Sequence, residues 1–304
     1  MQNLRKNAIA LLMTMMFIIA ITLSIGIGLK YTNDAQDTLK KEIFLIQTNV
    51  IIEDILNILK TSKELGMIKS EIELFIFLSK TSFIPIEYAD IKIALELRSA
   101  RAKFNPNTLY DSTSTNPNKQ RVLALKEYMS NNMVDPTYVD ILLDGMGGIK
   151  EDNIYNSDIF NEKPNLFRDY ITSSEHLKEF NDFYTNSFYD NSLSKIKFEE
   201  IFYFTKDKNV SIDLNYASAE VWKLMLGISD EEAKTLTLYA GAYTDENPPL
   251  LGDIQNEMLE NFKTSYFEPY IDVRLEIIQD MLSAKIVFEY DIVKRKGYNF
   301  HYEI

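Results

Sequence analysis

The sequence predicts an α+β fold in which a long N-terminal helix precedes an antiparallel sheet that carries a large helical insertion. Three observations lead to this class. An uncharged apolar run spans residues 8–29 and continues into an amphipathic helical pattern. Apolar and polar residues alternate near both ends of the remaining chain, which is typical of strands with one buried face. Between those ends, residues 105–262 carry helical patterns separated by loops rich in Asn, Asp, Gly and Pro.

The apolar run at residues 8–29 is long enough to cross a bilayer, whose apolar core is about 30 Å thick. Arg5 and Lys6 precede the run, so the positive-inside rule places the N-terminus in the cytoplasm and the rest of the chain outside it. The run is longer than the apolar core of a cleaved secretory signal, which favours a retained anchor. A secretory signal that is cleaved near residue 29 is the alternative.

The helical pattern continues after the apolar run to about residue 61. Its apolar positions recur every three to five residues, with charged residues between them; they are Leu39, Ile43, Ile46, Val50, Ile55 and Ile58. No proline occurs before Pro85, and Gly66 is a plausible stop for the helix. Part of this apolar stripe is expected to pack on the chain's own domain, and part to need another protein.

Alternating segments predict four strands with one buried face and a fifth strand at the edge. The four are residues 71–79, 91–98, 271–277 and 286–292, and the edge strand is residues 298–304. Periodic segments in the insertion predict helices at residues 119–131 and 217–226. Asn215 is well placed to cap the second of these helices, and Ser229 with Glu232 matches a capping box that opens another.

The composition excludes several kinds of chemistry. The chain has no cysteine and two histidines, His176 and His301, which excludes thiolate sites and leaves little for zinc binding or histidine-based catalysis. The formal net charge of -13 argues against a surface that binds nucleic-acid phosphates. We therefore expect neither catalytic nor nucleic-acid-binding residues. An acidic surface instead favours hard cations such as calcium.

Four carboxylates lie around a glycine-rich segment and are candidate calcium ligands: Asp140, Asp144, Glu151 and Asp152. The glycines allow the tight turns that bring carboxylates and carbonyls onto one cation. The spacing does not match an EF-hand loop. An ordinary solvated loop is therefore the alternative.

A helix, a tight turn and a second helix are expected over residues 213–240, an arrangement that resembles helix-hairpin-helix DNA binders. Those proteins hold a phosphate on a Gly-x-Gly turn with basic residues nearby. Here the turn Gly227-Ile228-Ser229 lacks the second glycine, and three carboxylates follow it. We therefore favour a packing hairpin over a membrane-anchored DNA receptor.

Four short stretches, spread over essentially the whole chain, carry a resemblance to a known family. They are RKNAIALL at 5–12, AKFNPNTL at 102–109, GIKEDNIY at 148–155, and residues 212–226, where Asp213-Leu214-Asn215-Tyr216-Ala217 resembles the family's Asn-x-Asn-x-Ala helix start. In this order, with the apolar helix before them and strands at both ends, the chain resembles general secretion pathway protein K, the large minor pseudopilin of type II secretion systems.

The resemblance implies a pilin-like sheet and a division of the chain into six parts. These are a prepilin leader at 1–8, the transmembrane part of the helix at 9–29, its periplasmic half at 30–66, the first strands at 67–104, the helical insertion at 105–262 and the closing strands at 263–304. Prepilin peptidase would cut between Ala8 and Ile9, although the family generally has glycine before the cut. Mature position five would be Met13, where most pilins have glutamate and protein K similarly has none. The family's reported calcium also supports the acidic segment as a cation site.

The function that the resemblance implies is structural and non-enzymatic. The chain would sit at the tip of the periplasmic pseudopilus, anchored in the bacterial inner membrane by a single pass with its C-terminal domain in the periplasm. Its partners would be other minor pseudopilins in a hetero-oligomeric tip complex, with prepilin peptidase acting on the leader. The alternative is the same kind of subunit in a competence or type IV pilus system for DNA uptake. A membrane-anchored enzyme is disfavoured because the sequence brings no carboxylate pair together in a cleft.

Overall fold

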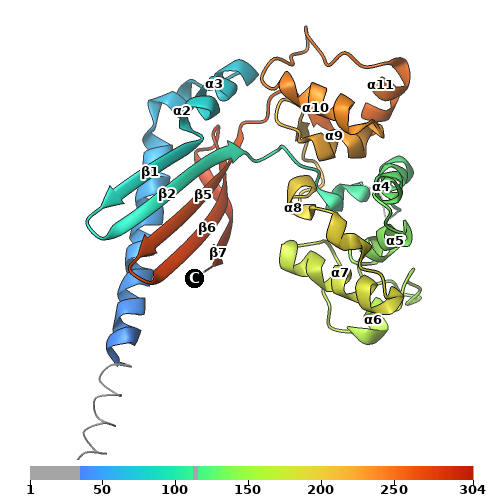
Figure 1. The fold of residues 1–304 in the computed structure, drawn as a ribbon, viewed down its shortest axis with the longest axis horizontal. Helices are drawn as coiled ribbons and strands as arrows, with labels where there is room; N and C mark the ends of the chain where they lie inside the picture. The colour runs from blue at the N-terminus through green and yellow to red at the C-terminus, as the bar shows by residue number, and fades with distance from the viewer. Residues whose placement is uncertain (1–34, 112–115, 304) are drawn as a thin grey trace, which may run out of the picture.

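The computed structural model of the chain describes residues 35–111 and 116–303 (Figure 1). A long N-terminal helix, described over residues 35–61, is followed by an antiparallel sheet and a set of helices. This confirms the predicted combination of helices with an antiparallel sheet behind a long first helix. The expected transmembrane part at residues 9–29 lies outside the described residues. Among the helices that are described, none combines the length and apolarity that crossing a membrane requires.

Five strands form the sheet in the order β1-β2-β5-β6-β7, and all neighbours are antiparallel. Their bounds are Phe83–Tyr88 for β1, Ile91–Ser99 for β2, Tyr270–Gln279 for β5, Leu282–Asp291 for β6 and Lys296–Glu303 for β7. The predicted strands at 91–98, 271–277, 286–292 and 298–304 are therefore confirmed, to within a few residues at their ends. Pro85 lies in β1, an edge strand, where a residue without an N–H group is tolerated.

The N-terminal helix packs lengthwise on one face of the sheet, and in Figure 1 it continues past the end of the strands. Buried side chains of the helix and alternate side chains of the strands form one cluster. It includes Phe44, Ile52, Ile55 and Leu59 from the helix and Leu95, Val273, Leu275, Ile286 and Phe288 from the strands. Burial on this single face explains the alternating pattern of the strands.

A hydrogen bond joins the end of this helix to the turn between β6 and β7. Arg295 donates from Nη1 to the carbonyl oxygen of Lys60 at 3.2 Å, in the last turn of the helix. A cation at this position satisfies a carbonyl that has no partner within the helix and interacts favourably with the helix dipole. Gly66 lies against the same guanidinium: a Cβ at this position would be only 2.6 Å from Arg295 Nη2. Gly66 is thus not the helix stop: it lies in a separate short helix, α2 (Lys63–Met67).

The predicted strand at 71–79 is wrong, because these residues belong to helix α3 (Glu71–Thr81). Ser70 caps this helix by accepting from the N–H of Glu73, whose carboxylate in turn accepts from the N–H of Lys69. Leu74 and Leu78, four residues apart, form its buried face. The segment 67–104, expected to hold the first strands, therefore contains a helix before β1 and β2.

The helices between β2 and β5 form a second body with its own core (Figure 1). They are α4 (Lys119–Asn131), α5 (Thr137–Asp144), α6 (Ile159–Glu162), α7 (Ser174–Phe188), α8 (Phe198–Ile201), α9 (Ala219–Leu226), α10 (Asp230–Leu238) and α11 (Asp253–Leu259), with the 3-10 turns η1 (Pro106–Leu109) and η2 (Ser192–Lys195). The helix predicted at 119–131 is confirmed, and so is the capping box of Ser229 and Glu232. A short parallel pair, β3 (Ile212–Asp213) and β4 (Thr264–Ser265), joins the end of this body to its middle.

A buried ion pair joins the helical body to the sheet. Arg101 is 5% exposed and lies two residues after the end of β2; its two terminal nitrogens donate hydrogen bonds to the carboxylate of Glu289 on β6. Its guanidinium also lies 4.1 Å from the centre of the Tyr270 ring on β5. Because a buried guanidinium without its carboxylate would be strongly destabilising, this pair fixes the position where the chain leaves the sheet.

Candidate functional site

The N-terminal helix is apolar on two opposite sides. At about 100° per residue, its side chains at positions 44, 48, 52, 55 and 59 share one side, and those at 39, 43, 46 and 50 share the other. The first set is buried against the sheet and consists of Phe44, Thr48, Ile52, Ile55 and Leu59. The second set, which we call the exposed stripe, consists of Leu39, Ile43, Ile46 and Val50, with exposed fractions of 56%, 45%, 64% and 52%.

The exposed stripe has the spacing of a helix-packing seam. Its intervals of four, three and four residues are those of the a and d positions in a coiled coil. The next turn of the helix on this side is polar and carries Glu53, Asp54 and Asn57. Single exposed apolar residues are common on protein surfaces, whereas contiguous apolar patches are typical of interaction surfaces, which makes this row a candidate contact surface.

The predicted apolar stripe thus combines residues that lie on two different faces of the helix. Ile55 belongs to the buried cluster on the sheet, whereas Leu39, Ile43, Ile46 and Val50 are exposed and are not part of that cluster. The helix region at residues 35–43 is exposed on every side. The half of the stripe that lies there has no partner among the described residues.

The segments Asn105-Pro106-Asn107 and Asp213-Leu214-Asn215 connect distant loops of the helical body through buried side-chain hydrogen bonds. Asn107 donates to the carbonyl oxygens of Ile171 and Thr205 and accepts from the N–H of Ile171, at 2.7–3.0 Å. Asn215 makes the same kind of pattern with the backbone of Tyr243 and Tyr266. These side-chain amides replace the backbone partners that buried loops would otherwise lack.

Asn215 is therefore not the cap of the following helix, as the sequence had suggested. Ser218 takes that position and accepts from the N–H of Val221 at 3.2 Å. Asn215 is too far upstream, and its amide is fully engaged with residues 28 and 51 positions away. Asp213, in the same segment, is completely buried and accepts from the N–H groups of Asn215 and Glu268.

The four predicted calcium ligands lie in different environments. Asp144 is fully buried at the end of α5, and its two oxygens accept from the backbone and side chains of Asn156 and Ser157 at 2.8–2.9 Å. Burial raises the pKa of Asp144 above its ordinary value, although these hydrogen bonds act in the opposite direction. Asp140 forms an ion pair with Lys126 on α4.

The other two candidate ligands, Glu151 and Asp152, are exposed, and Asp152 accepts from the N–H of Ile154. Across residues 35–111 and 116–303, no three His, Cys, Asp or Glu side chains are grouped so that they could hold a metal ion. Calcium binding at these four residues stays a prediction. The predicted cleavage residues Ala8 and Ile9, and Met13 at mature position five, lie outside the described part of the chain.

The turn between α9 and α10 does not present a basic surface. Gly227 has the left-handed conformation (φ 61°) that closes α9, and the capping box of α10 follows directly. The amine of Lys223 lies 2.6 Å from carboxylate oxygens of Glu220 and Asp230. This lysine is therefore already neutralised by the chain's own acidic residues.

The fold has a counterpart among solved structures. A chain in the crystal structure of the GspK-GspI-GspJ complex from the enterotoxigenic Escherichia coli Type 2 Secretion System matches with a TM-score of 0.60 over 89% of this chain and 99% of that one, at 11% identity. At this identity the match establishes the fold, which is GspK-like, as the sequence resemblance implied. No protein-family model and no curated protein matches the sequence.

Proposed function

We propose that the chain is a minor pseudopilin of a type II secretion system, located at the tip of the periplasmic pseudopilus. Its role is structural: it takes part in pseudopilus assembly and protein export without catalysing a reaction. The observation that carries this proposal is the exposed stripe of the N-terminal helix, which faces away from the sheet. The GspK-like fold supports it, since the matched structure is of a complex with GspI and GspJ.

In this proposal, helices of other minor pseudopilins cover the exposed stripe. The contact is a helix-to-helix seam, because Leu39, Ile43, Ile46 and Val50 follow heptad spacing and stop at Glu53. Covering such side chains contributes up to roughly 1.5–3 kcal/mol for each one that passes from full exposure to full burial. These side chains are about half exposed, so each contributes less than that range.

The N-terminal segment completes the proposal. Residues 9–29 anchor the chain in the inner membrane, with the described body in the periplasm. Prepilin peptidase cleaves between Ala8 and Ile9 and leaves Met13 at mature position five. Without a charge at that position, the membrane helix needs no polar partner from a subunit ahead of it, which suits a place at the tip.

The test replaces Ile46 by lysine in the full chain, expressed with its candidate partner pseudopilins. We expect the charge to abolish co-purification of the partners and export of a secreted reporter, while the sheet packing remains intact because Ile46 faces away from it. Leu250→Lys is the matched control, since this leucine is 99% exposed on a loop of the helical body. Normal assembly and export with Ile46→Lys would refute the proposal.

Two further experiments separate the parts of the proposal. Mass spectrometry of the membrane-bound protein, from cells with and without prepilin peptidase, is expected to give an N-terminus at Ile9 only with the peptidase. Deletion of the gene is expected to stop protein export. A deletion that leaves export unchanged but abolishes transformation would instead assign the subunit to a DNA-uptake pilus.

A further inference from the structure

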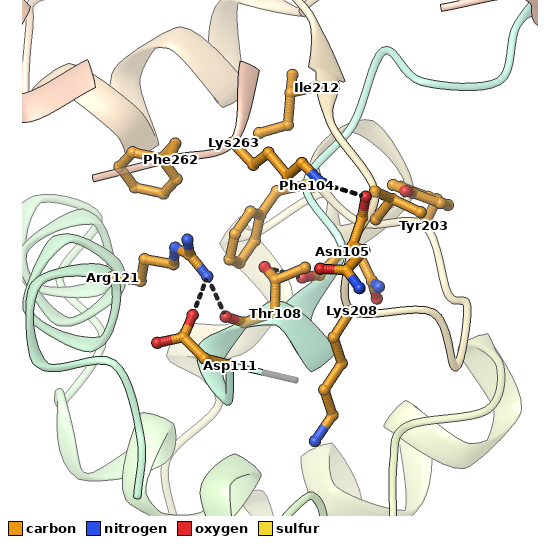
Figure 2. Close-up of a pocket in the computed structure, with 12 residues that line it drawn as sticks. Phe104, Asn105, Thr108, Asp111, Arg121, Tyr203, Lys208, Ile212, Phe262 and Lys263 are labelled. Atoms are coloured by element: carbon orange, nitrogen blue, oxygen red, sulfur yellow. Dashed lines mark hydrogen bonds and ion pairs between the residues drawn. The ribbon is translucent and has the colours of Figure 1, made fainter. Parts of the chain in front are cut away.

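A pocket opens in the helical body, and no residue of the N-terminal helix lines it (Figure 2). Its volume is about 240 Å³. It lies between the segment that enters the helical body, the first turn of α4 and the two segments that flank the β3–β4 pair. The residues that line it include Phe104, Thr108, Asp111, Arg121, Phe262 and Lys263.

The charge of this pocket is opposite to that of the chain. Among its lining residues Arg121, Lys208 and Lys263 are cationic and Asp111 alone is acidic, although the chain has a formal net charge of -13. The Lys208 amine points away from Arg121 in Figure 2 and lies 5.4 Å from the centre of the Tyr110 ring. The cations that face the pocket are therefore Arg121 and Lys263.

Arg121 is held rigidly and keeps one amino group available. Its Nε donates to the carbonyl oxygen of Asn261 at 2.7 Å, and its Nη1 donates to that of Thr108 at 2.7 Å and to Asp111 at 3.0 Å. Within the described part of the chain, Nη2 makes no hydrogen bond or ion pair, whereas Nε and Nη1 do. Lys263 donates one bond, to the carbonyl oxygen of Asn209 at 2.7 Å, and an ammonium group has three N–H donors.

Apolar side chains stand next to these donors. Phe104 and Phe262 pack edge to face, with ring centres 5.9 Å apart, and Ile212 completes this wall. A ligand that suits both features has an anionic group joined directly to an apolar one. The volume is below the range of drug-sized sites, about 300–1,000 Å³, so it suits a single residue.

We propose that this pocket binds the free C-terminal carboxylate of a peptide whose last residue is apolar. The carboxylate accepts from Arg121 Nη2 and the Lys263 amine, and the last side chain lies against Phe104 and Phe262. Both hydrogen bonds join a cationic donor to an anionic acceptor, and bonds of this kind are roughly twice as strong as those between neutral groups. The site is independent of the exposed stripe, so it goes beyond the role proposed above.

The test titrates the purified full chain with an acetylated tripeptide ending in leucine, by isothermal calorimetry. The same peptide with a C-terminal amide removes only the charge, and inorganic phosphate tests for a site that selects phosphate instead. We expect the acid to bind and the amide to bind at least tenfold more weakly. Lys263→Met is expected to weaken binding of the peptide acid roughly tenfold, because one hydrogen bond to a charged group is lost.

Lys234→Met, on the exposed side of α10, is the matched control and is expected to leave binding unchanged. Thermal melting of each variant verifies that it is folded, and Lys263 loses only one surface hydrogen bond on substitution. Equal binding of acid and amide, stronger binding of phosphate, or no binding of the acid up to about 10 mM would each overturn the proposal.

Discussion

The buried carboxyl group of Asp213 makes the stability of the helical body depend on pH. Asp213 is completely buried, and burial raises its pKa from 3.8 to about 8, against two backbone N–H groups that favour the charged form. The folded state thus binds a proton that the unfolded state releases near pH 4. The stabilisation from this group is fully present below pH 4 and is lost as the pH rises to about 8.

The magnitude follows from the two pKa values. Each pKa unit corresponds to 1.36 kcal/mol, so the whole difference between a pKa of 3.8 and one of about 8 amounts to about 6 kcal/mol, of which about 5 kcal/mol is lost between pH 4 and pH 8. Asp213→Asn removes the titration. We expect the free energy of unfolding of the natural chain, minus that of the variant, to fall by about 5 kcal/mol between pH 4 and pH 8.

Urea denaturation followed by tryptophan fluorescence measures this difference. Trp222 is the single tryptophan of the chain and is fully buried in the core of the same helical body. Asp245→Asn, which removes a carboxylate from an exposed loop, is the matched control. A difference between the natural chain and Asp213→Asn that stays constant from pH 4 to pH 8 would refute the reasoning.

Three other predictions concern the joints of the fold and the acidic segment. Gly241→Ala is expected to lower the free energy of unfolding by about 2 kcal/mol or more, measured by urea denaturation, because φ is 81° there and a Cβ would lie 2.4 Å from the Phe75 ring of α3; an unchanged midpoint would contradict this. Glu289→Gln is expected to cost about 3–5 kcal/mol, since it leaves Arg101 buried without its carboxylate; thermal melting with Glu276→Gln on the neighbouring strand as control measures it. Calcium is expected to raise the melting temperature of the natural chain and not of Asp144→Asn, and equal shifts in both would remove Asp144 from the ligand set.

The strands were predictable because one physical cause governs them. A sheet with one face on the core and the other in solvent forces an alternation along each strand, and β2, β5 and β6 follow it. Residues 71–79 also alternate, yet they form a helix. Leu74 and Leu78 occupy alternating positions and are also four residues apart. The pattern therefore fits both the period of a strand and that of a helix. The Ser70 and Glu73 pair, a capping-box spacing, was the local signal that favoured the helix.

Contacts between distant residues set the features that sequence reasoning missed. The amide of Asn215 binds the backbone at 243 and 266, and Arg101 pairs with a carboxylate 188 positions away. Neither partner is marked by a local pattern. For the same reason the amphipathic pattern of the first helix could not show which of its apolar residues would face the sheet.

The candidate sites differ in how much of each could be predicted from the sequence. The row from Leu39 to Val50 was predicted as part of an apolar stripe, and the structure separates it from the buried face. The acidic segment was predicted to converge around a cation; Asp144 accepts hydrogen bonds from Asn156 and Ser157, and calcium binding stays a prediction. The pocket at Arg121 was not predicted, since its lining comes from four separate parts of the chain.

The proposed role in the pseudopilus requires that partner helices cover the exposed stripe. Because the chain has no cysteine, single cysteines can be placed at each position from 39 to 50 and tested for cross-linking to partner pseudopilins in cells. We expect cross-links at positions 39, 43, 46 and 50 and none at 44 or 48, because these two side chains are buried against the sheet. Cross-links at every position alike, or at none, would contradict the proposed role.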